Sequence, residues 1–377
     1  MPMLSNYNFW FRRVIVFGLV FFSTAAFSKT ADLVLSAGGD VNFSKHLWRP
    51  HPLAVGPYPS TVLSFEEQFR GILPLIAGSD VNFANIETVL TDQKDLDPQD
   101  KTFNFQAHPA GLDYLIESGF NLFSLANNHS HDYGLRGIEE TLRHSSLRKQ
   151  GGKIAFSGVG LDLKEAVEPA ILEIKGYRIG FVAMGISGFL PTNQRAGVLS
   201  YNRPEHYKLA LEKLRTLNVD LRIVSIHTGT EGRVDLDHGQ RERFLEILQL
   251  SNADLILGHH PHVVRPVEIL SGKVIFYSLG NYAMIGSANI TNRGLSQDFG
   301  LLTKVYFVNN SQTGKPELRA IQLLPLTDTH RSPRLLDPSN SRERINHLNK
   351  LAQSNLPNGR SIVFEIENAT GTGFWQS

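Results

Sequence analysis

Cysteine is absent from the 377 residues, so the chain forms no disulfide, offers no thiolate to a metal and carries no lipoprotein cysteine for a lipid anchor. An excess of charge of either sign is missing as well, because 37 basic residues face 36 acidic ones. Together with the lack of a basic block, this balance argues against a nucleic acid partner. No Gly-x-x-x-x-Gly-Lys-[Ser/Thr] loop, fixed-period repeat or low-complexity segment occurs. The hydrophobic content of 41% is that of an ordinary globular protein.

The first 28 residues have the pattern of a secretory signal. Arg12 and Arg13 precede an apolar run over 14–22, and small residues follow at 23–26. We expect cleavage after Ser28 and export to the periplasm or another extracytoplasmic compartment, because the run is shorter than the roughly 20 residues of a membrane-spanning helix. The alternative is an uncleaved segment that anchors the protein in the membrane.

Short apolar runs alternate with amphipathic stretches along the rest of the chain. Strands are expected at 32–37, 81–86, 122–126, 154–156, 170–174, 179–184, 221–226, 254–257, 274–279, 301–308 and 317–324, and helices at 65–76, 109–117, 134–148, 205–217, 239–250 and 341–352. Strands separated by helices indicate a largely parallel sheet, and the close strand pairs near 170–184 and 301–324 indicate an antiparallel part. The pattern predicts an α/β fold with two sheets between helices. We expect one domain over 29–328 and a C-terminal extension over 329–377 with a short helix.

Polar side chains follow five of the expected strands at their carboxyl ends, where α/β sheets place their ligands. In chain order they are Asp40, Glu87, the run Asn127-Asn128-His129 with His131 and Asp132, His227, and the run Gly258-His259-His260-Pro261-His262. One such Asp or His would more often be a turn former, a helix cap or a structural group. Because five strand ends carry them at one edge, we predict a metal site rather than a purely structural cluster.

The residue types indicate which ions this site would hold. Imidazole, carboxylate and amide oxygen suit Mn, Fe or Zn, and Pro261 stiffens the turn that lets two histidines face one point. The candidate ligands are Asp40, Glu87, Asn128, His227, His260 and His262. Six exceed the three or four that a single catalytic zinc takes from protein. We therefore expect a divalent metal, either one ion or a pair about 3.5–4 Å apart that shares a bridging water or hydroxide.

Two further residues are candidates for proton transfer. His129 is adjacent to the expected ligand Asn128 and would be placed to donate a proton to a leaving group. Asp132, three residues on, either orients that imidazole or caps the helix expected from Gly134. The sequence leaves both roles of Asp132 open.

The order of the motifs resembles the CapA family of poly-γ-glutamate capsule biosynthesis, whose members resemble calcineurin-like metallophosphoesterases in fold. The matching stretches are AGGDVNF at 37–43, NIE at 85–87, LANNHSHDYG at 125–134, H-x-G-x-E at 227–231, GHHPHVVRPVE at 258–268 and IFYSLGNY at 275–282. The resemblance implies a four-layer α/β/β/α sandwich, export or membrane association, and a metal site at the six candidate ligands. We add Glu231, Arg265 and Asn281, which fall within these motifs, as substrate-binding candidates.

The chain departs from the usual motifs at three places. Asn42 stands where ordinary metallophosphoesterases carry the His of Asp-x-His, and CapA proteins as a group lack that His too. Thr228 replaces the Trp of the usual His-Trp-Gly, and Arg265 replaces a common Gln. The missing His weakens one metal position and argues against plain phosphoesterase activity.

Three functions compete at this point. The first is a metal-dependent hydrolase that cleaves a phosphoester, a phosphodiester or an amide in an envelope polymer. The second is a non-catalytic module that holds an anionic polymer for export in the same pocket, with local basic residues at Lys45, Arg195, Arg203, Arg233 and Arg265. The third is a structural envelope protein with a relict site. In each case membrane-bound capsule synthesis partners would supply any ATP-dependent step.

Overall fold

The computed structural model describes residues 31–43, 64–285, 294–295, 297–357 and 361–377. The expected signal segment and Lys45 lie outside these residues. Within the described ranges, no helix is both long and apolar enough to cross a membrane.

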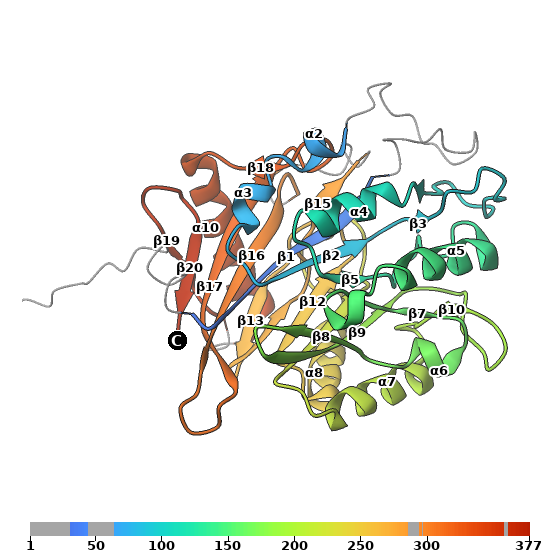
Figure 1. The fold of residues 1–377 in the computed structure, drawn as a ribbon. Helices are drawn as coiled ribbons and strands as arrows, with labels where there is room; N and C mark the ends of the chain where they lie inside the picture. Colours follow the sequence, from blue (N-terminus) through green and yellow to red (C-terminus); the bar gives the residue numbers. More distant parts are fainter. Residues whose placement is uncertain (1–30, 44–63, 286–293, 296, 358–360) are drawn as a thin grey trace, which may run out of the picture.

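Two large β-sheets form the centre of the molecule (Figure 1). The first has the order β19-β20-β17-β16-β1-β2-β5-β6, with β15 beside β1 and β18 beside β17. Its strands are β1 Leu33–Asn42, β2 Val81–Ile86, β5 Leu122–Ser124, β6 Ala155–Ser157, β15 Asn281–Met284, β16 Gly300–Asn309, β17 Pro316–Thr327, β18 Arg334–Leu335, β19 Glu365–Ile366 and β20 Gly373–Gln376. The core strands β1, β2, β5 and β6 run parallel to one another.

The second sheet has the order β13-β14-β12-β11-β9-β8. Its strands are β8 Ala170–Ile174, β9 Tyr177–Gly185, β11 Leu221–His227, β12 Leu255–His259, β13 Val267–Leu270 and β14 Lys273–Phe276. Two small pairs, β3 Val89–Leu90 with β4 Gln106–Ala107 and β7 Val159–Gly160 with β10 Gly197–Val198, complete the strands. The expected antiparallel pairs are observed as β8–β9 and β16–β17.

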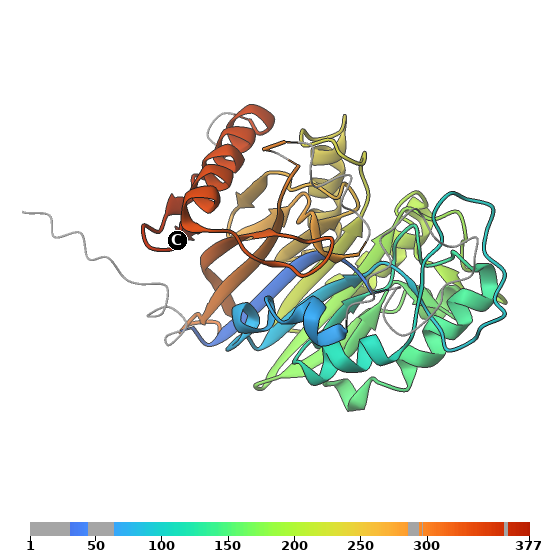
Figure 2. The same cartoon turned by 90° about the horizontal axis from the view of Figure 1, so that it is seen from above.

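Helices cover the outer sides of the two sheets (Figures 1 and 2). They are α2 Phe65–Phe69, α3 Leu73–Ile76, α4 Ala110–Glu117, α5 Gly134–Ser146, α6 Leu163–Ala166, α7 Pro204–Thr216, α8 Gln240–Ser251 and α10 Pro338–Asn355, with a 3-10 turn η1 at Gln150–Gly152. Between the sheets, Phe83 of β2 contacts Phe181 of β9 edge to face, with ring centroids 5.9 Å apart. A separate apolar cluster joins β9, β11 and β12 to α7 and α8. This arrangement confirms the expected α/β class with two sheets between helices.

Three expected elements differ from the observed ones. The helix expected over 65–76 is divided into α2 and α3, because Pro74 lacks the amide proton and clashes with the carbonyl four residues back. Strand β1 continues to Asn42 rather than stopping at residue 37, so Asp40 lies inside the strand. The segment after 329 holds the 18-residue helix α10 and the strand β20, which pairs with β17 and extends the first sheet.

Candidate metal centre

Strand β1 positions Asp40 by changing partners midway along its length. Its first half pairs with β16 through Ala37, and its second half pairs with β15 from Asp40 onward. The change occurs at Gly38-Gly39, where the neighbouring backbone comes very close: a Cβ on Gly39 would lie 1.7 Å from the Gly280 carbonyl oxygen. These two glycines therefore let the strand bring the Asp40 carboxylate to the sheet edge.

All six candidate ligands meet at the shared edge of the two sheets. Asp40, Glu87 and Asn128 come from the first sheet or the loop after β5, while His227, His260 and His262 come from the ends of β11 and β12 in the second. Ligand atoms of Glu87, His227 and His260 lie within 4.8 Å of one another, and so do those of Asp40, Glu87 and His262. Glu87 belongs to both groups, as a carboxylate shared by two ions would.

Three potential ligand atoms surround Nε2 of His227. Its Nε2 lies 2.7 Å from Asn128 Oδ1, 3.1 Å from His260 Nδ1 and 3.5 Å from Glu87 Oε1. On the other side of the ring, Asn85 Nδ2 lies 3.2 Å from Nδ1 and donates to Asp40 Oδ1 at 2.8 Å. Asn85 therefore fixes the orientation of the imidazole and of the Asp40 carboxylate together.

The His-Pro-His turn holds its two imidazoles with an unusual backbone. His260 and His262 have φ values of 95° and 56°, in the left-handed region that non-glycine residues seldom adopt. Nδ1 of His262 lies 2.8 Å from Asn281 Oδ1 and 3.4 Å from Asp40 Oδ2. Strain of this kind persists where surrounding contacts hold the residue in place, and it is frequent at functional sites. The structure thus brings Asn281 next to a candidate ligand.

The pKa values of the two carboxylates in this cluster are shifted in opposite directions. Burial raises the pKa of Glu87 well above its usual value, and the neighbouring Asp40 raises it further. Burial would raise the pKa of Asp40 too, but hydrogen bonds and charge from His227 and His262 hold it well below its usual range. Glu87 is 0% exposed, and neither of its carboxylate oxygens has a hydrogen bond to a residue that the structure describes. A buried carboxylate without donors fits a divalent cation, which would supply the missing positive charge.

We predict that metal affinity rises with pH between about 6 and 9. Burial alone would lower the pKa of His262, but the charges of Glu87, Asp40 and Glu231 outweigh it and raise the pKa to about 10. The imidazole is therefore protonated at neutral pH without metal, and a cation must displace that proton. Affinity should gain up to about tenfold per pH unit for each proton displaced. Chelator competition at several pH values measures it, and a pH-independent dissociation constant would contradict the protonated state of His262.

His129 and Asp132 form a pair next to the cluster. Nδ1 of His129 lies 2.7 Å from Asp132 Oδ2, and its Nε2 lies 3.9 Å from Glu87 Oε1. Helix α5 begins after Tyr133 without a side-chain cap, so the structure places Asp132 on the imidazole rather than at the helix end. Lys101 forms an ion pair with Asp132 and donates to the Asn128 carbonyl at 2.9 Å. The imidazole is thereby held with one nitrogen toward the cluster.

Replacing Asp132 by asparagine should lower the pKa of His129 by about one unit or more. Burial already lowers that pKa, and the Asp132 carboxylate is the main group that raises it, because it stabilises the imidazolium. NMR titration of the His129 ring would measure the shift. The matched control is Asp95→Asn, since that side chain is 74% exposed. An unchanged His129 titration in D132N would mean that the carboxylate does not act on the ring.

Arg265 is not available to a substrate, contrary to its place among the expected substrate-binding residues. Its side chain is 0% exposed, and its guanidinium is used by the loop after β11. Nη1 donates to Asp237 Oδ2 at 2.8 Å and to Gln240 Oε1 at 2.7 Å, and the other nitrogens donate to backbone carbonyls of the same loop. Arg265 therefore ties this loop to the His-Pro-His segment. Glu231, in contrast, is exposed on that loop, and its charge acts on Glu87 and His262.

Lys101, Asn85 and His259 lie at the metal cluster but were not among the predicted site residues. The NIE motif could have identified Asn85, because its amide lies two residues before the candidate ligand Glu87. His259 stacks on Phe83 with ring centroids 5.3 Å apart, and burial lowers its pKa to about 4. Asn42 is fully buried at the end of β1.

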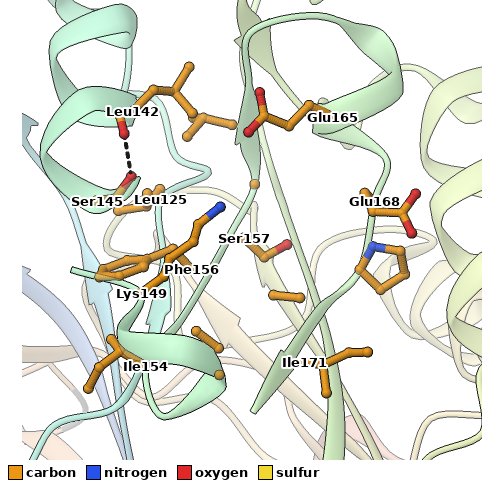
Figure 3. Close-up of a pocket in the computed structure, with 16 residues that line it drawn as sticks. Leu125, Leu142, Ser145, Lys149, Ile154, Phe156, Ser157, Glu165, Glu168 and Ile171 are labelled. Carbon is orange, nitrogen blue, oxygen red and sulfur yellow. Dashed lines mark hydrogen bonds between the residues drawn. The ribbon is translucent and has the colours of Figure 1, made fainter. Parts of the chain in front are cut away.

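A separate cavity of about 310 Å³ opens where the edge strands β6 and β8 approach each other (Figure 3). Leu142, Phe156 and Ile171 line it, with Lys149, Glu165 and Glu168 among its polar residues. None of the expected site residues lines this cavity. It is therefore distinct from the metal cluster.

Comparison with known proteins identifies a bacterial family over the part of the chain that carries these motifs. Residues 34–285 match the family model described as "Bacterial capsule synthesis protein PGA_cap". The chain is 30% identical over 260 residues to the PGA biosynthesis protein CapA of Bacillus subtilis (strain 168), covering 68% of this chain and 64% of the relative. It is 29% identical over 222 residues to the capsule biosynthesis protein CapA of Bacillus anthracis, covering 57% and 53%. The chain thus spans less than two thirds of these curated relatives. Among solved structures, the calcineurin-like phosphoesterase YfkN from Bacillus subtilis is 13% identical, with a TM-score of 0.37 over 81% of this chain and 89% of that one.

Proposed function

Because this chain belongs to the family of the bacterial capsule synthesis protein PGA_cap, we propose that it acts in the biosynthesis of a poly-γ-glutamate capsule or a related envelope polymer as a metal-dependent hydrolase. The family membership supports the first part of the proposal. The second part depends on the cluster of ligands at the edge of the two sheets.

The observation that carries the hydrolase proposal is the state of Glu87. This carboxylate is fully buried, has no hydrogen bond to a described residue, and belongs to both groups of converging ligands. A protein pays several kcal/mol for a buried charge unless a partner compensates it. A divalent cation is the partner that the neighbouring histidines and amide oxygen would accept.

The proposed mechanism assigns six residues to metal binding and two to proton transfer. Asp40, Glu87, Asn128, His227, His260 and His262 would hold one or two ions of Mn, Fe or Zn. When bound, such ions supply Lewis acidity and lower the pKa of water. His129, oriented by Asp132 at 2.7 Å, would move a proton at its Nε2. Because its pKa is lowered, the ring is neutral near pH 7 and is better prepared to accept a proton than to donate one.

A second candidate function is a non-catalytic module that binds an anionic polymer for export. Asn42 favours it, because an amide stands here where ordinary metallophosphoesterases carry a metal-binding histidine. A weakly held second ion would leave a binding pocket without efficient hydrolysis. In either case we propose an exported protein, cleaved or anchored at its N-terminus, that works beside membrane-bound synthesis partners.

The first experiment is elemental analysis of purified residues 29–377 beside the His260→Ala/His262→Ala variant. One to two equivalents of Mn, Fe or Zn, lost in the variant, are expected. The same samples are then assayed on γ-glutamyl amides and on phosphodiesters, before and after chelation. Hydrolysis that survives exhaustive chelation unchanged would refute the metal-dependent mechanism. Metal without hydrolysis, together with polymer binding, would favour the export module.

A further inference from the structure

A second hollow lies on the loop that follows the candidate ligand His227. It measures about 390 Å³ and is formed by the loop after β11 and the first turn of α8, with Thr228, Thr230, Asp237, Gln240, Tyr201 and Arg243 among its lining residues. Thr228 follows the candidate ligand His227, so the Cα atoms of the two residues are about 3.8 Å apart. Gly229, another lining residue, approaches Pro261 between the candidate ligands His260 and His262, because a Cβ on Gly229 would lie 3.1 Å from Pro261 Cγ. An extended polymer bound in this pocket would therefore reach the His-Pro-His turn.

Arg243 supplies a cation to the pocket. Its guanidinium carbon lies 5.6 Å from the centre of the Tyr201 ring, and Nη1 donates to the Tyr207 hydroxyl at 3.3 Å. These contacts hold the side chain while leaving Nη2 without a hydrogen bond to any residue described in the structure. At 39% exposure, the guanidinium can reach a ligand in the hollow. A planar guanidinium with free donors matches a carboxylate.

Gln240 offers a buried donor at the base of the same pocket. The residue is 5% exposed, and its Oε1 accepts from Arg265 Nη1 at 2.7 Å. Its Nε2 is buried and has no hydrogen-bond partner among the described residues. A buried amide nitrogen that lacks an acceptor is costly, so an oxygen from a ligand would relieve it.

The charges around the pocket favour one negative charge rather than two. Asp237 is paired with Arg265 at 2.8 Å, which leaves it neutralised. Near Arg243, Glu246 lies 3.7 Å from that side chain and pairs more closely with Lys208, at 2.8 Å. Arg243, Lys208 and Glu246 together carry one net positive charge. This suits a carboxylate better than a phosphate dianion.

We propose that this pocket is a subsite for a carboxylate of the acidic polymer substrate, bound by Arg243 and by Nε2 of Gln240 next to the metal cluster. The inference rests on the proposed function, because it identifies where a γ-linked glutamate residue would be held while a neighbouring bond lies at the cluster. It also gives the loop that Arg265 fixes a role in substrate recognition.

Binding of a γ-linked glutamate hexamer by calorimetry tests the subsite in the full-length protein. Arg243→Gln removes the cation, and Gln240→Glu keeps the acceptor for Arg265 while replacing the donor by a second oxygen. Each variant should bind at least about tenfold more weakly, as expected for a lost charge-assisted hydrogen bond. Arg243→Lys, which keeps the charge without the planar fork, should fall between them and the wild type. Arg215→Gln, an exposed change of equal charge on α7, should bind like the wild type.

The outcomes separate this inference from the function on which it rests. Wild-type affinity in folded R243Q and Q240E, with the wild type binding the hexamer, would refute the subsite and leave the proposed function intact. A wild-type protein that neither binds the hexamer nor cleaves γ-glutamyl amides would refute both. Inorganic phosphate that binds the wild type but not R243Q, together with equal hexamer affinity in the two proteins, would keep the anion site and refute the choice of a carboxylate.

Discussion

Glu87→Gln is expected to remove the bound metal and, without metal, to make the protein more stable than the wild type. Because Glu87 belongs to both groups of ligands, loss of its charge weakens both positions. We expect metal affinity to fall by more than about a hundredfold, and any hydrolysis to fall with it. Elemental analysis and chelator competition would measure the first effect.

The gain in stability without metal follows from the same burial. The folded-state pKa of Glu87 is raised, so the folded protein holds a proton that the unfolded chain has lost above its own pKa. Folding is therefore penalised as pH rises through that window, and glutamine removes the penalty. In the presence of chelator, the unfolding free energy of E87Q should exceed that of the wild type by an amount on the order of 2 kcal/mol, so E87Q should melt at the higher temperature. The difference should be larger at pH 8 than at pH 5.

A control variant and the addition of metal test whether these effects are specific to Glu87. Glu205→Gln changes the same chemical group at a side chain that is 61% exposed, and it should alter neither metal content nor stability. Added metal should stabilise the wild type and leave E87Q where it was, so that the order of the two melting temperatures reverses. An E87Q protein that retains metal would exclude Glu87 as a ligand.

Gly39→Ala is expected to prevent folding or to cost more than about 4 kcal/mol of unfolding free energy. Its new methyl group would lie 1.7 Å from the carbonyl oxygen of Gly280, where Gly39 is inside β1 and Gly280 directly precedes β15. Neither strand can move without displacing Asp40 or Asn281 from the cluster. Urea unfolding measures the loss, and soluble yield is the readout if no folded protein remains.

Gly188→Ala is the matched control, because a Cβ there meets nothing within 4 Å. It should change the unfolding free energy by less than about 0.5 kcal/mol. If G39A melts with the wild type, the close approach of β1 to the segment before β15 does not exist as described.

Local pattern was sufficient to predict the long strands of both sheets and the polar residues near their ends, but not short strands such as β13, β15 and β20. The run 221–226 is apolar except for Arg222 and Ser225, because most of the strand is buried, and a histidine directly after such a run is conspicuous. His227 was found for this reason, and Asp40 was found because it follows the run 32–37 after two glycines. Their mutual distances were not predictable, because a strand end specifies an edge of a sheet and not the neighbour across it.

Three features depended on contacts between distant parts of the chain. Lys101 lies in an irregular segment without periodicity, so nothing local pointed to its ion pair with Asp132. Arg265 was expected near a substrate because it is a basic residue within the motif at 258–268, yet the loop after β11 surrounds its guanidinium. The change of partner at Gly38-Gly39 involves β15, some 240 residues later in the chain.

The origin of the ligands has a mechanical consequence. Asp40, Glu87 and Asn128 belong to one half of the sandwich, and His227, His260 and His262 belong to the other. An ion held by both would cross-link the two sheets, and neither set of three ligands alone would complete the site. Displacing one sheet by about an ångström would lengthen the metal–ligand distances, so metal affinity would report on the relative position of the two sheets.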